Sequence, residues 1–171
     1  INPGAKFGLG DELVVPNVVS VSGAPNVRGV AIAKSAASIE IDKSEHVLFV
    51  LDKDGTPLAG FPISIGSPQD PLPLGAMKIA TEVKNPTFTY NPAILKNAPA
   101  DATKVEVAPG PNNPVGSTWL GLSKPHWGIH GTPSPARVGH EETNGCIHMT
   151  NWDDQRLSTL VKAGFVVDVK A

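Results

Sequence analysis

Two reactive side chains with glycine neighbours lie close together in the last third of the chain. Cys146, the single cysteine, directly follows Gly145, and His130 is flanked by Gly128 and Gly131. A single thiol cannot form a disulfide within the chain, so it is either a small buried hydrophobic side chain or a nucleophile. Histidine can supply the base that a thiol needs near neutral pH, and glycine lets backbone N–H groups approach a reacting atom. The residues alone leave both interpretations open.

The elements that position these side chains are predicted to be β-strands joined by turns. Glycine and proline contribute 17 residues each, and 40% of the chain is apolar, which is typical of a turn-rich globular β protein. Apolar alternation predicts strands at residues 37–41, 46–51, 61–65, 77–83, 87–90, 104–107, 119–122 and 165–169. The polar, proline-containing segment 133–143 predicts a loop that brings the strand ends carrying His130 and Cys146 together.

One helix is predicted directly after the cysteine. Thr150 can cap it together with Asp153, which stands at the capping-box spacing. Apolar residues then follow at helical spacing and a glycine is expected to end the helix: Leu157, Leu160, Val161 and Gly164. The predicted architecture is mainly β, with one or two packed sheets and this helix.

Length and charge limit the domain organisation and the class of partner. A chain of 171 residues suits one domain, and we expect a turn-rich lead-in or linker at residues 1–35 followed by the domain at residues 36–171. Because the net charge is −2, there is no electrostatic reason to expect nucleic acid or an anionic membrane as partner. No apolar run is long enough for a membrane-spanning helix. The first residue is Ile1, so we expect a processed chain from which a signal peptide has been removed.

Several motifs around the two side chains together resemble the signature of bacterial L,D-transpeptidase catalytic domains, the YkuD-type family. That signature is His-Gly-Thr, a proline, an aliphatic-Gly pair and Ser/Thr-x-Gly-Cys. It is matched by residues 130–132, Pro135, residues 138–139 and residues 143–146. The likeness runs from about Ala37 to Val169, and it implies a β-sandwich of mixed sheets with a helix after the cysteine motif.

The resemblance implies a cysteine acyltransferase of the bacterial cell wall that uses no cofactor and no metal. Cys146, as thiolate, is expected to attack the carbonyl of the third, diamino-acid residue of a tetrapeptide stem and to expel D-alanine. An amine of a second stem then attacks the thioester, and His130 is the expected base. The partners are therefore peptidoglycan stem peptides, in the periplasm or elsewhere outside the cytoplasmic membrane, and acylation by carbapenems is a family expectation.

The same resemblance assigns supporting roles to the residues around the nucleophile. The backbone N–H groups of Asn144, Gly145 and Cys146 are the expected oxyanion donors, each contributing on the order of 3 kcal/mol in related chemistry. The hydroxyls of Thr132 and Thr143 are expected to hold the loop and the histidine, or to make ordinary turn hydrogen bonds. Glycine at 131 leaves room for close backbone approach.

Two positions depart from the family pattern. Many relatives carry histidine where this chain has Asn144, and arginine where it has His148. The first departure favours His130 as the base, while the second removes a fixed positive charge that could hold a substrate carboxylate or the loop. If residues 146–149 are extended, His148 shares a face with Cys146 and could touch the thiol. By the same alternation His126 shares a face with His130 and is expected to line the pocket, with Trp127 turned into the core.

Other functions stay open on the sequence. A zinc site is one, since five possible ligands crowd a short window: His126, His130, His140, Cys146 and His148. Water as acceptor would give an L,D-carboxypeptidase or endopeptidase with the same Cys–His chemistry. A non-catalytic wall-binding relative is a third reading of the departures at Asn144 and His148.

Overall fold

The structure is a computed structural model, and it describes residues 35–91, 103–140 and 143–171. The secondary structure of these residues consists mainly of strands: β1 (Ala36–Asp42), β2 (Val47–Asp52), β3 (Pro57–Pro62), β4 (Gly75–Lys84), β5 (Phe88–Tyr90), β6 (Val105–Val107), β7 (Thr118–Leu122), β8 (Gly128–Thr132), β9 (Ile147–Thr150) and β10 (Val166–Lys170). Helix α2 (Asn151–Leu160) follows the cysteine motif, and the 3-10 turn η3 (Pro135–Arg137) precedes it. The predicted lead-in, residues 1–35, lies outside the described residues apart from residue 35.

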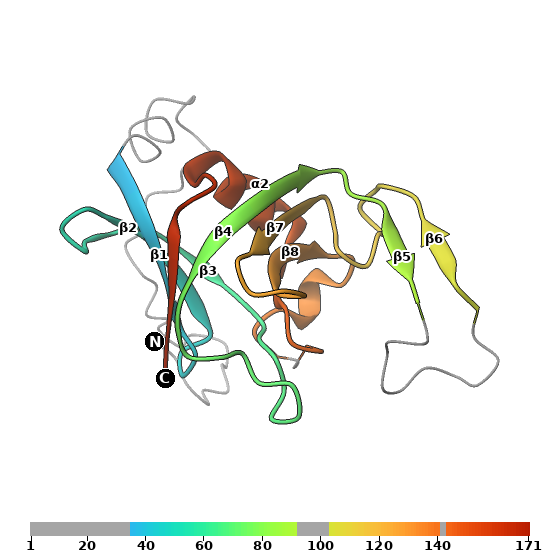
Figure 1. Cartoon of the computed structure of the whole chain (residues 1–171), viewed down its shortest axis with the longest axis horizontal. Coiled ribbons are helices and arrows are strands. Elements are labelled where there is room, and N and C mark those ends of the chain that lie inside the picture. The colour runs from blue at the N-terminus through green and yellow to red at the C-terminus, as the bar shows by residue number, and fades with distance from the viewer. Residues whose placement is uncertain (1–34, 92–102, 141–142) are drawn as a thin grey trace, which may run out of the picture.

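Eight strands form one mixed sheet in the order β3-β2-β1-β10-β4-β7-β8-β9 (Figure 1). Its neighbours are antiparallel except for the pairs β1–β10 and β8–β9, which are parallel. β5 and β6 form a separate two-stranded ribbon at the side of the molecule beyond β7 and β8. The predicted fold class, mainly β with mixed sheets and a helix after the cysteine, is confirmed.

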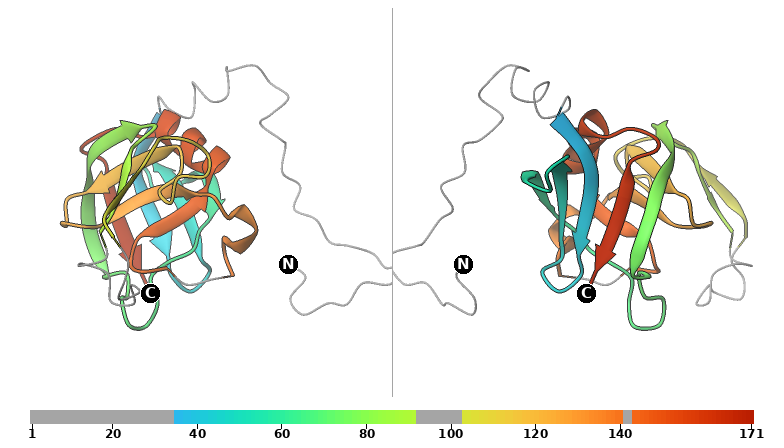
Figure 2. Two further views of the ribbon diagram at one scale, coloured as in Figure 1. Left: turned by 90° about the vertical axis from the view of Figure 1, so that its right-hand side faces the viewer. Right: turned by 60° about the vertical axis from the view of Figure 1, so that its left-hand side comes forward.

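Strand β4 joins the two halves of the sheet. It pairs with β10 through residues 75–78 and with β7 through residues 79–84, with a register shift between Ile79 and Thr81. Such a shift bends a strand, and β4 leaves β1 and β10 (Figure 2, right) to arch over towards β7 (Figure 1). The two far edges meet, since Ser64, just after β3, exchanges two backbone hydrogen bonds of 2.9 Å with His148 in β9. The sheet therefore folds over and closes around one core.

The core consists of the apolar residues that alternate along these strands, together with one face of α2. Fully buried side chains come from both halves of the sheet and from the helix: Ile39, Ile41, Leu48, Val50, Ile63, Ile79, Leu120, Ile129, Ile147, Met149, Leu157 and Val167. Each buried aliphatic side chain of this size stabilises the fold by about 1.5–3 kcal/mol relative to exposure.

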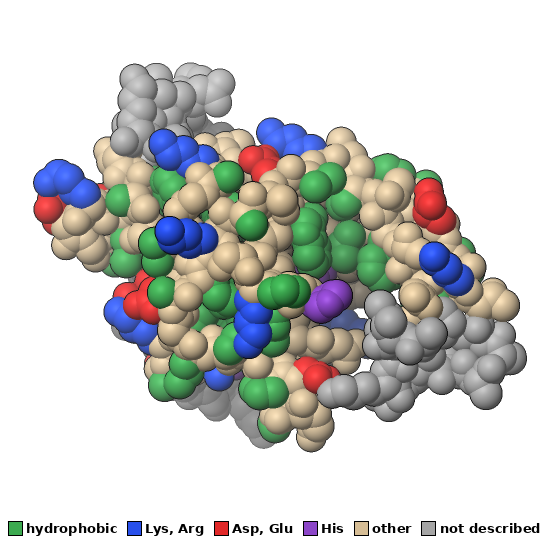
Figure 3. All heavy atoms as spheres, in the orientation of Figure 1, with side chains coloured by type: hydrophobic (Ala, Val, Ile, Leu, Met, Phe, Trp, Pro, Cys, Tyr) green, Lys and Arg blue, Asp and Glu red, His purple; other side chains and the backbone are tan. Residues whose placement is uncertain are grey.

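Charged side chains of both signs are scattered over the face shown in Figure 3.

The predicted start of α2 is confirmed and its predicted end is wrong. The Thr150 hydroxyl accepts from the Asp153 N–H at 3.1 Å and donates to the Asp153 carboxylate at 2.8 Å. The helix stops at Leu160, because Val161 adopts an extended backbone and places its branched side chain in the core. Gly164 instead forms the turn before β10, with φ +93° and its N–H donated to the carbonyl of Ile79.

Candidate active site

His130 is held in a single tautomer by the strand that carries it. Its side chain is 3% exposed in the middle of β8. Nδ1 lies 2.7 Å from the carbonyl oxygen of Gly131. A carbonyl can only accept, so Nδ1 carries the hydrogen and Nε2 keeps a lone pair. The imidazole is therefore oriented to take a proton at Nε2.

Three aromatic side chains stand in register across β7, β8 and β9. Trp119 is paired with His130, and His130 with His148. The Trp119 ring stacks on His130 at 5.2 Å between centroids and 22° between planes, and the His148 ring lies on the other side at 4.4 Å and 53°. Neighbouring strands place paired side chains on one face, so the ladder fixes the histidine ring from both sides.

Burial keeps both imidazoles neutral. It lowers the pKa of His130 to about 3, with a further lowering by His148 that the Gly131 hydrogen bond partly offsets. Burial also lowers the pKa of His148 to about 4. Two positive rings this close would repel each other, so at neutral pH the pair is uncharged.

The Cys146 thiol lies directly before β9, beside the turn that precedes β8. It donates to the carbonyl oxygen of His126 at 3.6 Å. Burial raises its pKa, and the nearby backbone of Gly128 lowers it in part. Among the described residues, the sulfur makes no hydrogen bond to the imidazole of His130 or of His148. The resting site therefore holds a neutral thiol and a neutral imidazole.

Thr143 stabilises the cysteine loop, residues 143–146, by hydrogen bonds within the loop and to the opposite edge of the sheet. Its hydroxyl donates to the Cys146 carbonyl at 2.5 Å and accepts from the Gly145 N–H at 3.2 Å. Its backbone N–H donates to Ile65 and its carbonyl accepts from Ser67. Gly145 has φ +117°, a conformation that favours glycine, and its Cα lies close to Gly66. The loop geometry thus depends on segment 64–67, far away in the sequence.

Gly131 allows helix α2 to pack directly against the histidine strand. A Cβ at this position would lie 2.1 Å from Oδ1 of Asn151, the first residue of α2. That oxygen accepts from the Ser117 N–H, and the side-chain amide donates to the Pro111 carbonyl. Asn151 therefore fastens the loop before β7 to the back of the site.

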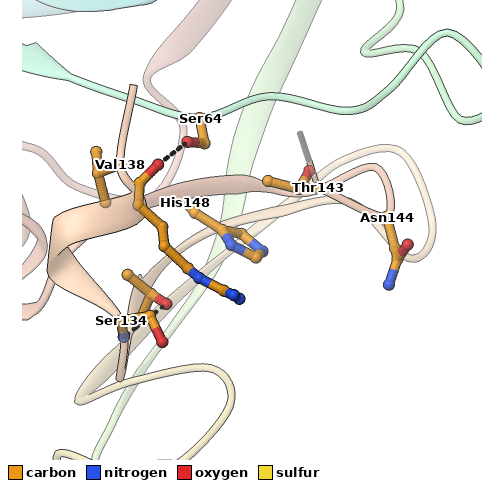
Figure 4. Close-up of a pocket in the computed structure, with 8 residues that line it drawn as sticks. Ser64, Ser134, Val138, Thr143, Asn144 and His148 are labelled. Carbon is orange, nitrogen blue, oxygen red and sulfur yellow. Dashed lines mark hydrogen bonds between the residues drawn. The ribbon is translucent and has the colours of Figure 1, made fainter. Parts of the chain in front are cut away.

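A cavity of about 180 Å³ opens beside His148 (Figure 4). It is lined by Ser64, Thr132, Ser134, Arg137, Val138, Thr143, Asn144 and His148. Three of the predicted site residues, Thr132, Thr143 and Asn144, thus share this wall with His148. The Thr132 hydroxyl accepts from the Ser134 N–H at 3.2 Å.

His126 is placed differently from the strand alternation that we expected. β8 begins at Gly128, so His126 lies in the preceding turn, with φ +68° and an exposed side chain. Its carbonyl, and not its ring, reaches Cys146. Trp127 is half-buried and packs against the core, as predicted.

Sequence reasoning missed several residues that build the site. Ser64 lies within an alternating apolar run, and only the closing of the sheet shows that its backbone pairs with His148. Arg137 and Ser134 stand in a loop without periodicity, and the pairing of Trp119 with His130 depends on the register of β7. Asp154, in the first turn of α2, is fully buried beneath β7 and β8. A charged residue at a core-facing helix position was a signal that could have been noticed.

The five residues considered as zinc ligands do not come together in the described parts of the chain. No group of three or more His, Cys, Asp or Glu side chains there has a metal-binding arrangement. His130 and His148 are adjacent, while the His140 side chain is exposed.

The fold and this site define a mainly β domain with a cysteine directly before β9 and a histidine in the neighbouring parallel strand β8. A family model for the L,D-transpeptidase catalytic domain, YkuD, matches residues 36–169. The chain belongs to this family.

Similar proteins agree with this assignment. A putative L,D-transpeptidase YkuD of Bacillus subtilis is 26% identical over 170 residues, which cover 98% of this chain and 81% of the relative. A putative L,D-transpeptidase YkuD of Bacillus licheniformis is 44% identical over 61 residues, 36% of this chain and 37% of the relative. The matched segment thus spans little more than a third of that protein.

Solved structures show the same fold. An L,D-transpeptidase from Mycobacterium smegmatis superposes with a TM-score of 0.62 at 19% identity, over 80% of this chain and 59% of that one. The catalytic domain of an Enterococcus faecium L,D-transpeptidase, acylated by ertapenem, superposes with a TM-score of 0.58 at 22% identity. The match covers 80% of this chain and 98% of that one. Among the described residues of this chain, no helix has the length and apolar character needed to cross a membrane.

Proposed function

We propose that this protein is a peptidoglycan L,D-transpeptidase. In this reaction Cys146 attacks the carbonyl of the third residue of a tetrapeptide stem, releases D-alanine, and passes the acyl group to an amine of another stem. The observation that carries the proposal is the tautomer of His130, whose Nδ1–H is held by Gly131 and whose Nε2 is left to accept a proton. Family membership supports the same chemistry.

Proton transfer accompanies attack in this mechanism, because thiol and imidazole are both neutral at rest. The thiol turns from the His126 carbonyl and its proton passes to His130 Nε2 as sulfur bonds to the carbonyl carbon. The imidazolium then gives this proton to the departing amine of D-alanine, which leaves a thioester. An incoming amine loses its proton to the same nitrogen and restores the thiol. One peptide bond replaces another, so no external energy source is needed.

The oxyanion of each tetrahedral intermediate is assigned to backbone amides of the cysteine loop. The Gly145 N–H is already donated to the Thr143 hydroxyl. We therefore assign the main donors to the amides of Asn144 and Cys146, with Gly145 supplying the left-handed backbone that turns them inward. Thr143 keeps this turn in place through its hydrogen bond to the Cys146 carbonyl.

The substrate and inhibitors follow from the proposal. A peptidoglycan stem lies outside the cytoplasmic membrane, so the protein acts in the periplasm or elsewhere in the cell envelope. Solved relatives in the same fold are described as complexes or adducts with imipenem and ertapenem. By analogy, carbapenems are expected to acylate Cys146 of this chain.

Purified tetrapeptide muropeptides provide the test. The protein is incubated with them and the products are weighed by mass spectrometry, with the Cys146→Ala variant as control. Cross-linked dimers together with free D-alanine support the transpeptidase. Tripeptides alone identify water as the acceptor and a carboxypeptidase, whereas unchanged substrate and an unreactive thiol would point to a wall-binding module.

A further inference from the structure

The cavity beside His148 has a chemical character that the proposed mechanism does not use. Four of the eight described lining residues carry a hydroxyl group, Asn144 adds an amide, and no carboxylate belongs to this described part of the wall. The guanidinium of Arg137 supplies its permanent positive charge, because burial lowers the pKa of His148 to about 4. A polar cavity with a fixed cation, the Asn144 amide and the hydroxyl of Ser134 suits an anionic oxygen group.

The size of the cavity limits what can enter. Its volume of about 180 Å³ suits a small group such as a carboxylate. His148 forms part of the wall and also contacts the His130 ring, at 4.4 Å between centroids. Asn144, at the opposite end of the cysteine loop, lines the same space. The cavity therefore adjoins the cysteine loop through Asn144 and the His130 ring through His148, although neither Cys146 nor His130 lines it.

The backbone that carries Arg137 is fixed relative to this place. The Ser64 hydroxyl donates to the Arg137 carbonyl at 3.4 Å and accepts from the Gly139 N–H at 3.0 Å. The same serine pairs with His148 through two backbone hydrogen bonds. Arg137 also makes a contact within the chain, and a guanidinium has five N–H donors with which to serve more than one acceptor.

We propose that this cavity is a carboxylate-binding subsite in which Arg137 holds a carboxylate of the donor peptide next to the scissile bond. The proposal rests on the proposed function for the identity of the donor. The carboxylate belongs either to the terminal D-alanine or to the side chain of the third residue. Arg137 is thus a specificity residue, which selects donors by charge and positions their carbonyl over Cys146.

Binding measured without turnover tests the subsite. In the Cys146→Ala background, three stem tetrapeptides are titrated calorimetrically: a lysine stem ending in free D-alanine, the same stem ending in D-alanine amide, and a diaminopimelate stem ending in D-alanine amide. Removing the bound carboxylate is expected to weaken binding about 10- to 100-fold, the loss typical of a charge-assisted hydrogen bond. A loss of affinity on amidation of the lysine stem identifies the terminal carboxylate. Tighter binding of the diaminopimelate amide than of both lysine stems identifies the side-chain carboxylate.

Variants at Arg137 complete the test. Arg137→Gln should abolish the difference between the peptides, and Arg137→Lys, which keeps the charge without the planar fork, should restore part of it. Lys53→Gln is the control: it removes one positive charge from a hairpin, where the lysine side chain is 82% exposed. It should leave the affinities of all three peptides unchanged. Equal binding of all three peptides, or an unchanged difference in Arg137→Gln, overturns the subsite.

Release of D-alanine by the unmodified protein is followed separately. Its absence refutes the proposed transpeptidase without affecting the binding result. Alkylation of Cys146 by iodoacetamide should be the same in Arg137→Gln as in the unmodified protein, which separates a specificity role from damage to the thiol. Near-ultraviolet circular dichroism checks that the variant is folded.

Discussion

The carboxyl group of Asp154 is expected to remain protonated in the folded protein at neutral pH. It is 0% exposed, and neither oxygen accepts a hydrogen bond of normal geometry among the described residues. Burial raises its pKa to about 8, although the nearby backbone of Gly131 and the backbone and hydroxyl of Thr118 lower it in part. In such a place these groups stabilise an ionised carboxylate less than burial destabilises it.

The sign of the effect on stability follows from proton linkage. The folded pKa lies above the ordinary value of 3.8, so between pH 4 and 8 the folded chain keeps a proton that the unfolded chain releases. Stability therefore falls as pH rises through this window, by at most about 1.4 kcal/mol per unit. Asparagine has nearly the shape of the protonated acid and does not ionise. As the pH rises from 4.5 to 7.5, the free energy of unfolding of Asp154→Asn should thus increase by up to about 4 kcal/mol relative to that of the unmodified protein.

Urea denaturation at the two pH values measures this difference. The variant is expected to be close to the unmodified protein at pH 4.5 and clearly more stable at pH 7.5. Asp54→Asn, at an exposed hairpin position, is the matched control and should change the free energy of unfolding by less than about 0.5 kcal/mol. If the effect of Asp154→Asn is the same at both pH values within about 0.5 kcal/mol, the carboxyl ionises in the folded state and the reasoning from burial is wrong.

Three further predictions concern the site itself. Replacement of His130 by alanine should lower the rate of acylation of Cys146 by about 100-fold or more, while His148→Ala should retain most of that rate. Mass spectrometry of the acyl-enzyme measures both rates. The reverse order would make His148 the base. Because burial raises the pKa of Cys146, alkylation by iodoacetamide should increase about tenfold per pH unit from pH 7 to 8, whereas a plateau beginning near pH 6 would reveal a thiolate–imidazolium pair. Gly131→Ala should destabilise the fold by about 1–3 kcal/mol through its clash with Asn151. Adding Asn151→Ala should recover part of that loss in urea denaturation, and strictly additive effects would exclude the clash.

Local patterns in the sequence were sufficient for most elements of the fold. The alternation around Ile39, Ile41 and Ile79 predicted buried strands, and the Thr150–Asp153 pair predicted the start of α2, because each depends on residues within a few positions of one another. The end of α2 was not predictable in this way. Val161 leaves the helix to fill the core, and that preference depends on strands distant in the sequence.

By itself the sequence determined the two residues of the proposed chemistry, the glycines around them and the family, since these lie in one continuous stretch whose spacing is specific. Only the tertiary structure decided their environment. Strand register stacked Trp119 and His148 on His130, and closure of the sheet brought Ser64 to the back of the cysteine loop. The same closure formed the cavity that Arg137 lines. Burial, pKa and cavity shape are properties of residues brought together from distant positions, so they appear only when the chain is folded.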